Sequence, residues 1–501
     1  MTTVLRRLLW TFLIGLIPAA ALAEEAGTIV PSPSPVMIVP FLLLLLAIAV
    51  APFINKHWWE RWYPAVSIGL GAITLSYYVF VLGSPGQMLH TVTEYVSFIA
   101  LIGSLFVVAG GIVIRIKGRS TPLRNVILLA LGAVISNIVG TTGASMIMIR
   151  PYLRVNRYRI KPYHVVFFIF IVSNMGGALT PIGDPPLFLG YLRGIPFFWV
   201  AEHLWYKWAI GVLLVIAAFF VMDYRDFVRL PDHVRRSALH EEEEGEVSGM
   251  HNVVFLLLIL IAVFLTDPPF LREMLMVAAA AGSYFTTHRR IHEKNDFNFT
   301  PVKEVAILFI GIFLTMVPAL DWLEGHAASI GVNSPGQFYW ATGSLSAFLD
   351  NAPTYLNFLS ATYGLFVNPE MVAGVQRLIA DHGLGVASLI GGHADEIRNT
   401  FTVLMKYHAD LVATGNVPLD DIATAYIIGN HNIYLQAISI AAVFFGACSY
   451  IGNGPNFMVK SIADHAGVKT PSFGGYILRY TIPVLLPVFL LLWFLFFSGI
   501  V

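Results

Sequence analysis

"GALTPIGDPPLF", residues 177–188, interrupts a long apolar stretch of the chain. Three prolines and one carboxylate fall where a helix would otherwise continue: Pro181, Pro185, Pro186 and Asp184. Proline breaks a helix, and a carboxylate in apolar surroundings is costly unless it has partners. The stretch therefore predicts a broken helix with an acidic group at the break.

The composition places this broken helix in a membrane. Of 501 residues, 57% are hydrophobic and 12% are charged, about half the charged share of a soluble globular protein. A membrane span needs about 20 apolar residues. Apolar runs of that order lie at 36–55, 64–82, 95–115, 122–149, 163–192, 205–222, 252–266, 273–286, 304–322, 336–365, 424–463 and 474–499. We predict an all-α polytopic membrane protein whose two halves, 36–222 and 251–501, are joined by a cytoplasmic linker, 223–250.

Basic residues in the loops predict the topology. Residues 1–23 resemble a secretory signal peptide, with an uncleaved first helix as the alternative, and cleavage would leave the N-terminus outside. Both flanks of the run 122–149 are strongly basic, which puts both on the inside. That run is therefore predicted to be a re-entrant hairpin turning at "GTTG". The second half runs in the opposite sense, with a hairpin at 336–365, an outside insertion at 366–423 and an outside C-terminus.

The opening motif has a counterpart in the second half. "GACSYIGNGPNF", residues 446–457, repeats its glycines, proline and final phenylalanine in register. The hairpins also align, "SNIVGTTGAS" with "LDNAPTYLNF", which pairs Asn137 with Asn351 and Thr141 or Thr142 with Thr354. We predict two inverted-topology repeats, each with a re-entrant hairpin and a broken transmembrane helix. Paired discontinuous segments are the best sequence indication of a transporter's binding site.

Each half contributes one acid to this predicted centre, Asp184 and Asp350. Two interpretations stay open: the acids bind a cation in exchange for protons, or each merely caps a helix end. Carboxylate, amide and hydroxyl oxygens suit a hard cation, and we expect a Na⁺ site formed by Asp184, Asn137, Asp350 and Asn351. Further candidate ligands are Asn453, Ser136, Thr141, Thr142, Gly183, Thr180, Thr354 and Ser449. For the asparagines, holding the loops is an equally open role.

Three secondary candidates flank these motifs. Glu94 and Glu304 each head an apolar helix, where an interaction with the helix end is as good an explanation as transport. Asn174 precedes the first break and is a candidate to support it. No Lys or Arg is predicted at the membrane midplane, which favours a cation over an anion as the ligand. The chain has no Walker A motif, so direct drive by ATP is not expected.

The motifs resemble a known superfamily. "SNIVGTTGASMIMIRPYLR", "GGALTPIGDPPLFLG" and "YIGNGPNF" are similar to the ion-transporter superfamily of arsenite and citrate carriers, in particular to the NhaD-type sodium/proton antiporters. The resemblance implies scaffold and transport parts, elevator-like alternating access and a homodimer. It implies cation ligands at Ser136, Asn137, Gly183, Asp184, Asp350, Asn351 and Asn453. Pro185 and Pro186 stand where NhaD-type sequences have threonines, so ion specificity stays open.

The sequence as a whole predicts a secondary active transporter of the bacterial inner membrane rather than an enzyme. We expect it to exchange Na⁺ or Li⁺ for H⁺, with no cofactor besides the transported ions. Membrane lipid and small inorganic cations are the expected partners, and the net charge of +0 gives no indication of nucleic-acid binding. The alternative is a sodium-coupled symporter of carboxylates or other anions. A third possibility is a membrane assembly protein that transports nothing.

Overall fold

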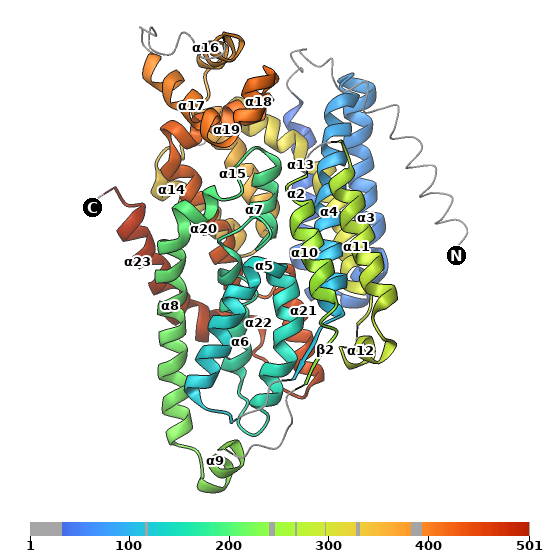
Figure 1. Cartoon of the computed structure of the whole chain (residues 1–501), viewed down its shortest axis with the longest axis vertical. Helices are drawn as coiled ribbons and strands as arrows, with labels where there is room; N and C mark the ends of the chain where they lie inside the picture. The colour runs from blue at the N-terminus through green and yellow to red at the C-terminus, as the bar shows by residue number, and fades with distance from the viewer. Residues whose placement is uncertain are drawn as a thin grey trace. The chain divides into compact units, whose positions relative to one another are not determined.

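A computed structural model describes residues 33–115, 119–239, 246–265, 268–295, 297–326, 331–381 and 393–499. The predicted signal peptide lies outside these residues. Figure 1 shows a helical protein with one short antiparallel ribbon, in which β1 (Val113–Arg115) pairs with β2 (Glu246–Ser248). The helices before the ribbon closes are α2 (Val39–Ile54), α3 (Lys56–Ser76), α4 (Pro85–Gly110), α5 (Pro122–Val155), α6 (Pro162–Ile171), α7 (Pro185–Leu192), α8 (Trp199–Val228) and α9 (Asp232–Leu239).

The helices after the ribbon are more numerous and shorter. They are α10 (Asn252–Ala262), α11 (Leu271–Thr286), α12 (Arg289–Lys294), α13 (Thr300–His326), α14 (Pro335–Ser346), α15 (Asn351–Phe366), α16 (Pro369–Ala380), α17 (Ala394–Tyr407), α18 (Ala409–Thr414), α19 (Leu419–Asn430), α20 (Asn432–Phe445), α21 (Gly454–His465), α22 (Phe473–Tyr476) and α23 (Leu486–Phe496). Short 3₁₀ and π segments complete the chain: η2 (Pro35–Ile38), η3 (Tyr77–Val81), η4 (Met175–Gly177), η7 (Gly446–Cys448) and η8 (Ile477–Leu485).

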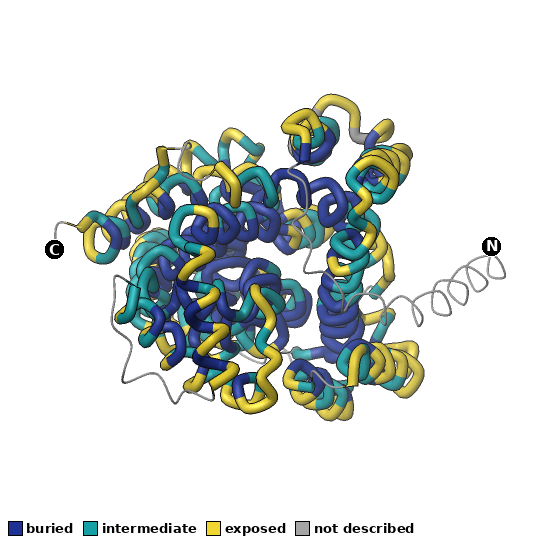
Figure 2. Tube along the Cα trace, turned by 90° about the horizontal axis from the view of Figure 1, so that it is seen from above, coloured by how far each residue is buried: buried dark blue, intermediate teal, exposed yellow. Residues whose placement is uncertain are grey.

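Many of these helices can cross a membrane. Within the described part of the chain, 7 helices are long and apolar enough to span a bilayer, or up to 8 if α19 and α20, bent by 102°, form one span. Their outward side chains are apolar as well: Phe80 is 83% exposed and Phe285 82%. Figure 2 shows such exposed positions in yellow on the outer helices and buried positions in dark blue. Lipid covers this surface more favourably than water, so the all-α, multi-pass membrane prediction is confirmed.

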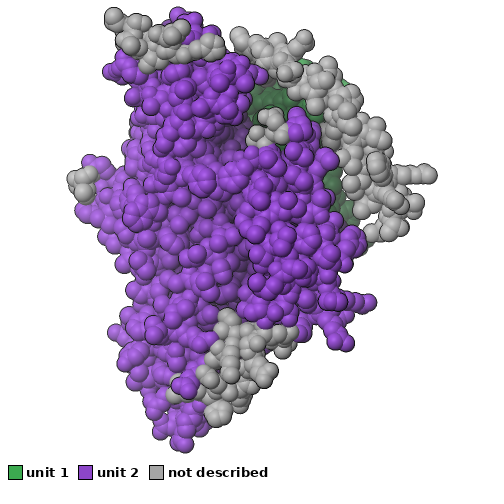
Figure 3. All heavy atoms as spheres, viewed as in Figure 1, with its two compact units in different colours: residues 1–97, 304–325 green, residues 98–303, 326–501 purple. Residues whose placement is uncertain are grey.

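The chain divides into two compact units, coloured separately in Figure 3. Unit 1 comprises Met1–Ser97 and Glu304–Gly325, and unit 2 comprises Phe98–Lys303 and His326–Val501. Each unit therefore draws on both sequence halves. Within unit 1, α3 and α13 pack closely, because a Cβ at Gly311 would lie only 2.2 Å from Oγ of Ser67.

Besides the bend between α19 and α20, the described part of unit 2 contains four interrupted helices. In α5 the break falls at Gly140, whose φ of 75° and ψ of 157° are essentially confined to glycine. A short turn separates α14 from α15. The other two interruptions are longer: α6, η4 and α7 form one broken helix, and α20, η7 and α21 form the other. Prolines in the first turns of α7 and α21 restart these helices after each break.

Helices also extend into the predicted linker and the predicted insertion. Helix α8 continues to Val228, so the first residues of the 223–250 linker are helical. The 366–423 insertion is also largely helical in its described part, forming α16, α17, α18 and the start of α19. Both α16 and α17 alternate apolar and polar residues with helical period and bury the apolar side. Short amphipathic helices of this kind lack the long apolar run from which membrane helices were assigned in the sequence.

Candidate functional site

The four interrupted helices meet at one carboxylate, that of Asp184, which is buried at the start of α7. Its Oδ1 accepts hydrogen bonds from Oγ1 of Thr141 at 2.7 Å and from Nδ2 of Asn453 at 3.0 Å. Its Oδ2 accepts a short hydrogen bond from Nδ2 of Asn351. Thr141 follows the break in α5, Asn351 begins α15 and Asn453 precedes α21. The structure thus brings residues from all four broken helices to one acidic group.

The two longer breaks have the same local geometry. Asp184 and Asn453 adopt matching backbone angles, φ −146° and ψ 144° against φ −157° and ψ 144°. In the first break, Oγ1 of Thr180 accepts from the Gly183 amide at 3.0 Å. In the second, Oγ of Ser449 accepts from the Gly452 amide at 3.1 Å. The equivalence that the sequence predicted between these two motifs therefore extends to their hydrogen bonds.

The hairpin alignment, in contrast, is wrong by four residues. Thr180 donates to the carbonyl of Asn137 at 2.6 Å, and its counterpart Ser449 donates to the carbonyl of Ala347 at 2.6 Å. Asn137 is therefore equivalent to Ala347, not to Asn351. The same offset makes Thr141 equivalent to Asn351, and these two side chains contact the same carboxylate. The alignment failed because it matched identical letters, whereas position relative to the break decides equivalence.

Several predicted ligands turn out to hold the backbone. Asn137 uses its amide nitrogen on the carbonyls of Ala133 and Gly176, at 3.0 and 2.7 Å, and its oxygen on the Leu179 amide at 2.9 Å. Ser136 bonds the carbonyls of Gly132 and Val172. Thr354 donates to the Asp350 carbonyl at 3.0 Å. In the described structure these predicted ligands bond backbone groups and make no hydrogen bond to the Asp184 carboxylate: Asn137, Ser136, Thr180, Ser449 and Thr354.

Asp350 makes no hydrogen bond to Asp184 in the described structure, although its carboxylate is near enough to repel that of Asp184. It is half-buried and caps α15, with Oδ1 accepting from the Ala352 amide at 3.1 Å. The hydrogen bond that Asp350 makes therefore fits the interpretation in which it caps a helix end. Glu94 and Glu304 belong to unit 1, whereas the Asp184 group belongs to unit 2.

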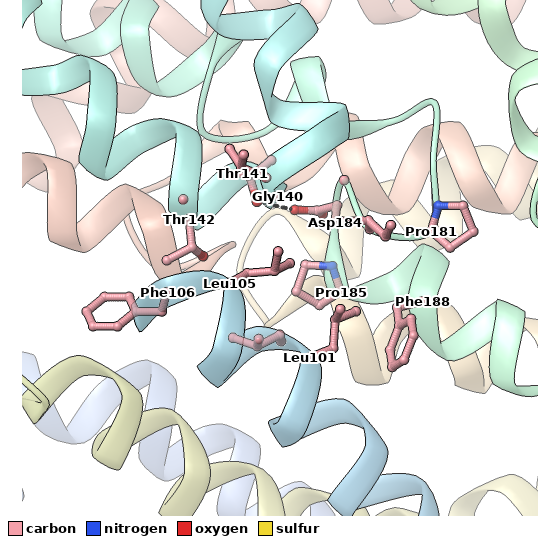
Figure 4. Close-up of a pocket in the computed structure, with 15 residues that line it drawn as sticks. Leu101, Leu105, Phe106, Gly140, Thr141, Thr142, Pro181, Asp184, Pro185 and Phe188 are labelled. Carbon is pink, nitrogen blue, oxygen red and sulfur yellow. Dashed lines mark hydrogen bonds between the residues drawn. The ribbon is translucent and has the colours of Figure 1, made fainter. Parts of the chain in front are cut away.

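A small pocket in unit 2, with room for about one water-sized occupant, opens onto Asp184. Figure 4 shows Thr141 and Asp184 joined by their hydrogen bond, with Leu101 and Leu105 of α4 across the pocket from them. The lining residues are Leu101, Ile102, Leu105, Phe106, Val139, Gly140, Thr141, Thr142, Gly143, Pro181, Ile182, Gly183, Asp184, Pro185 and Phe188. Asp184 is the sole charged residue in this lining, which otherwise offers two hydroxyls, backbone groups and apolar surface. Such a pocket suits a small cation better than an organic anion.

A second buried carboxylate, Asp223 in α8, has a different character. Its oxygens accept from Arg159, with which it forms a fully buried ion pair, from Tyr163 at 2.8 Å and from Asn125 at 3.0 Å. Nε2 of His164 lies 3.2 Å away. These partners come from α5, α6 and the loop between them, so Asp223 ties those elements to α8. The sequence interpretation missed this group because Asp223 stands at the edge of an assumed linker.

Two further buried polar residues were overlooked. Lys207 of α8 is buried, donates to Oε1 of Gln436 at 2.6 Å and lies 5.0 Å from the ring centre of Phe496. Asn456 of α21 accepts a hydrogen bond from Asn174 at 2.6 Å and thereby joins the two broken helices. Neither residue has uniformly apolar neighbours three and four positions away, so helical periodicity alone would not have found them.

Comparison with known families now adds to this geometry. A family model described as "Putative citrate transport" matches residues 32–497. The chain belongs to this family. Its membership supports the broader part of the resemblance, an ion and citrate transporter superfamily, and identifies the protein as a membrane transporter. No curated protein matches the chain.

Proposed function

We propose that this family member exchanges Na⁺ or Li⁺ for H⁺ by alternating access, with Asp184 as the group that carries either ion. The observation that supports this best is a buried carboxylate surrounded by a hydroxyl and two carboxamides, next to a pocket whose lining has no Lys, Arg or His. A buried acid without a basic partner needs a compensating positive charge, and a proton or a metal cation supplies it.

The carboxamides around Asp184 can serve either ion. With nitrogen toward the carboxylate, Asn351 and Asn453 donate hydrogen bonds to it. A half-turn of the Asn351 amide would present an oxygen to a cation held at Asp184. Oδ1 of Asn351 is buried and has no hydrogen-bond partner among the described residues. Rotating the amide therefore costs the hydrogen bond from Nδ2 to Asp184 but none at Oδ1. One carboxylate cannot hold a proton and bind a cation equally well, and this competition couples the two fluxes.

The fold features that exchange requires are part of the same proposal. The matching hydrogen bonds at the two long breaks support a structural repeat. The basic flanks of residues 122–149 and the glycine-only break at Gly140 support a re-entrant hairpin in the first half. We further propose inverted topology, a homodimer in the bacterial inner membrane and periplasmic termini. Movement of the unit that carries Asp184 would then expose the site to either side.

Sodium-coupled uptake of a carboxylate is the second candidate. The family description favours it. Helix N-termini attract anions. The N-termini near the site therefore also favour uptake of a carboxylate: the starts of α7 and α15 and the point after Gly140 where α5 resumes. A citrate-like substrate would, however, bring several negative charges beside Asp184 with no basic side chain in the pocket lining. This charge balance makes cation exchange the preferred function.

Proteoliposomes with an acidic interior and an internal pH dye separate the two functions. Adding Na⁺ or Li⁺ outside is expected to raise the internal pH with wild-type protein and to have no effect with Asp184→Asn. Citrate added with Na⁺ should not change this rate. Uptake of labelled citrate that requires Na⁺, without proton movement driven by Na⁺ alone, would replace exchange with symport.

A further inference from the structure

The pocket beside Asp184 has one wall whose side chains are all apolar. Four residues of α4 form it: Leu101, Ile102, Leu105 and Phe106. Their spacing of one, four and five residues places them on one face of that helix. Figure 4 shows Leu101 and Leu105 across the pocket from Asp184. Because the space between has room for about one water-sized occupant, an ion held there has oxygen on one side and hydrocarbon on the other.

The two leucines of this wall are closely packed. A Cβ at Gly140, in the break of α5, would lie 3.7 Å from Cδ1 of Leu105, which is an ordinary van der Waals distance. Leu105 is 5% exposed and Leu101 is 2% exposed. Both side chains are therefore held within the protein, and the width of the pocket depends on the volume that they fill.

The C-terminal end of α4 is anchored, which keeps the wall in place. Asn295, which follows α12, donates from Nδ2 to the carbonyl of Gly110, the last residue of α4, at 2.8 Å. The ring centre of Phe106 lies 5.5 Å from that of Phe297, which in turn lies 6.2 Å from that of Tyr284 in α11. Close-packed side chains of this kind resist displacement, so the pocket does not widen readily around a larger ion.

A fixed apolar wall discriminates between monovalent cations. An ion that enters must lose the water on its apolar side, because hydrocarbon side chains cannot replace that water. The loss is offset only by oxygens that the ion can contact, and the size of the cavity decides which ion reaches them at a suitable distance. K⁺ is larger than Li⁺ and Na⁺, so it needs a wider pocket than these two ions do.

We propose that Leu101 and Leu105 determine ion specificity, because they hold the pocket at a width that admits Li⁺ and Na⁺ and excludes K⁺. The inference rests on the proposed exchange at Asp184 and adds to it the residues that select the cation. Truncating either leucine should widen the pocket and admit K⁺, while the hydrogen bonds to Asp184 stay unchanged.

Leu101→Ala and Leu105→Ala test the two sides of the wall separately. Ile99→Ala is the matched control, because it removes the same number of carbon atoms from α4 at a position outside the pocket lining. Purified proteins that elute as a single folded species would be compared by displacement of radioactive Na⁺ with K⁺ and with unlabelled Na⁺, while choline maintains the ionic strength. The same proteins would be assayed in liposomes for proton movement driven by K⁺ and by Na⁺.

In wild type and Ile99→Ala, K⁺ should displace Na⁺ poorly and drive no proton movement. An apolar pocket discriminates between occupants that differ by one methylene by about 10- to 200-fold. Each leucine variant should therefore lower the K⁺ concentration needed for displacement, relative to that of Na⁺, by about tenfold or more, and K⁺ should then drive proton movement.

Three results would overturn the inference and leave exchange intact, provided that Na⁺ drives proton movement in the wild type. They are unchanged displacement by K⁺ in the folded leucine variants, an equal change in Ile99→Ala, and equal displacement by K⁺ and Na⁺ in the wild type. A wild type that binds Na⁺ selectively but moves no protons would instead overturn exchange. Loss of that selectivity in the leucine variants would still support the role of the wall.

Discussion

Replacing Thr141 by valine tests the role of the hydroxyl on Asp184. Valine keeps the shape of the side chain and removes a hydrogen bond of 2.7 Å between two buried groups. A hydrogen bond to a charged group contributes about 1.5–3 kcal/mol, and each 1.4 kcal/mol corresponds to about tenfold in affinity. Thr141→Val should therefore raise the KM for Na⁺ about 10- to 100-fold at the pH where protons compete.

The direction of the pH effect follows from the same bond. The hydroxyl stabilises the ionised carboxylate, so its loss favours the protonated form and strengthens competition by protons. At higher pH protons become scarce, and the difference in KM between Thr141→Val and wild type should shrink. The assay is initial proton movement in liposomes against Na⁺ concentration at several pH values.

Thr142→Val is the matched control. Thr142 also lines the pocket, but it makes no hydrogen bond to Asp184 in the described structure. Its replacement should leave the KM for Na⁺ within about threefold of wild type, as expected when no bond to the charged group is lost. Equal KM values for Thr141→Val and wild type, or the same rise in both variants, would refute the assignment of this hydroxyl to the ionised carboxylate.

Three other perturbations have definite expected outcomes. Arg159→Leu leaves the carboxylate of Asp223 buried and without its cation, which should cost about 3–5 kcal/mol and lower the melting temperature in detergent; an unchanged melting curve would show that the ion pair is dispensable. Gly140→Ala forces a side chain into a glycine-only conformation, at about 1–3 kcal/mol, and should slow transport by displacing Thr141; wild-type turnover would contradict a rigid break. Asn137→Ala should reduce the maximal rate with little change in KM for Na⁺, because its amide bonds only backbone groups; a large rise in KM alone would restore it as a ligand.

The central part of the site could be predicted from the sequence because it rests on local signals. Prolines around Asp184 and the repeated motif at Asn453 indicate helix breaks directly. The structure brings Thr141, Asn351 and Asn453 to the carboxylate of Asp184. The Na⁺ site expected from the sequence shares Asp184 and Asn351 with this group. Local sequence decides where a helix ends, and the apolar runs decide that the helices lie in a membrane.

The rest depends on long-range geometry, which letters alone do not specify. Asn137 looked like a ligand, but its amide nitrogen bonds the carbonyl of Ala133 in its own helix and the carbonyl of Gly176 in the break after α6. The position of that break relative to Asn137 is set only in the folded chain. Asn456 was not singled out from the sequence, because its partners are the carbonyls of Gly446 and Ser449, which are free to accept only once the helix breaks there. Asp350 could not be distinguished from Asp184 by sequence, because both are good N-caps and only the tertiary contacts differ.

The most direct measurement is the release of protons when Na⁺ is added to purified protein in weakly buffered detergent solution. If Asp184 exchanges a proton for a cation, wild-type protein should release protons on binding Na⁺ near neutral pH, and Asp184→Asn should release none while remaining folded. Release that is equal in the two proteins would assign the proton to another group. No release from wild type at any pH, despite measurable Na⁺ binding, would contradict exchange at Asp184.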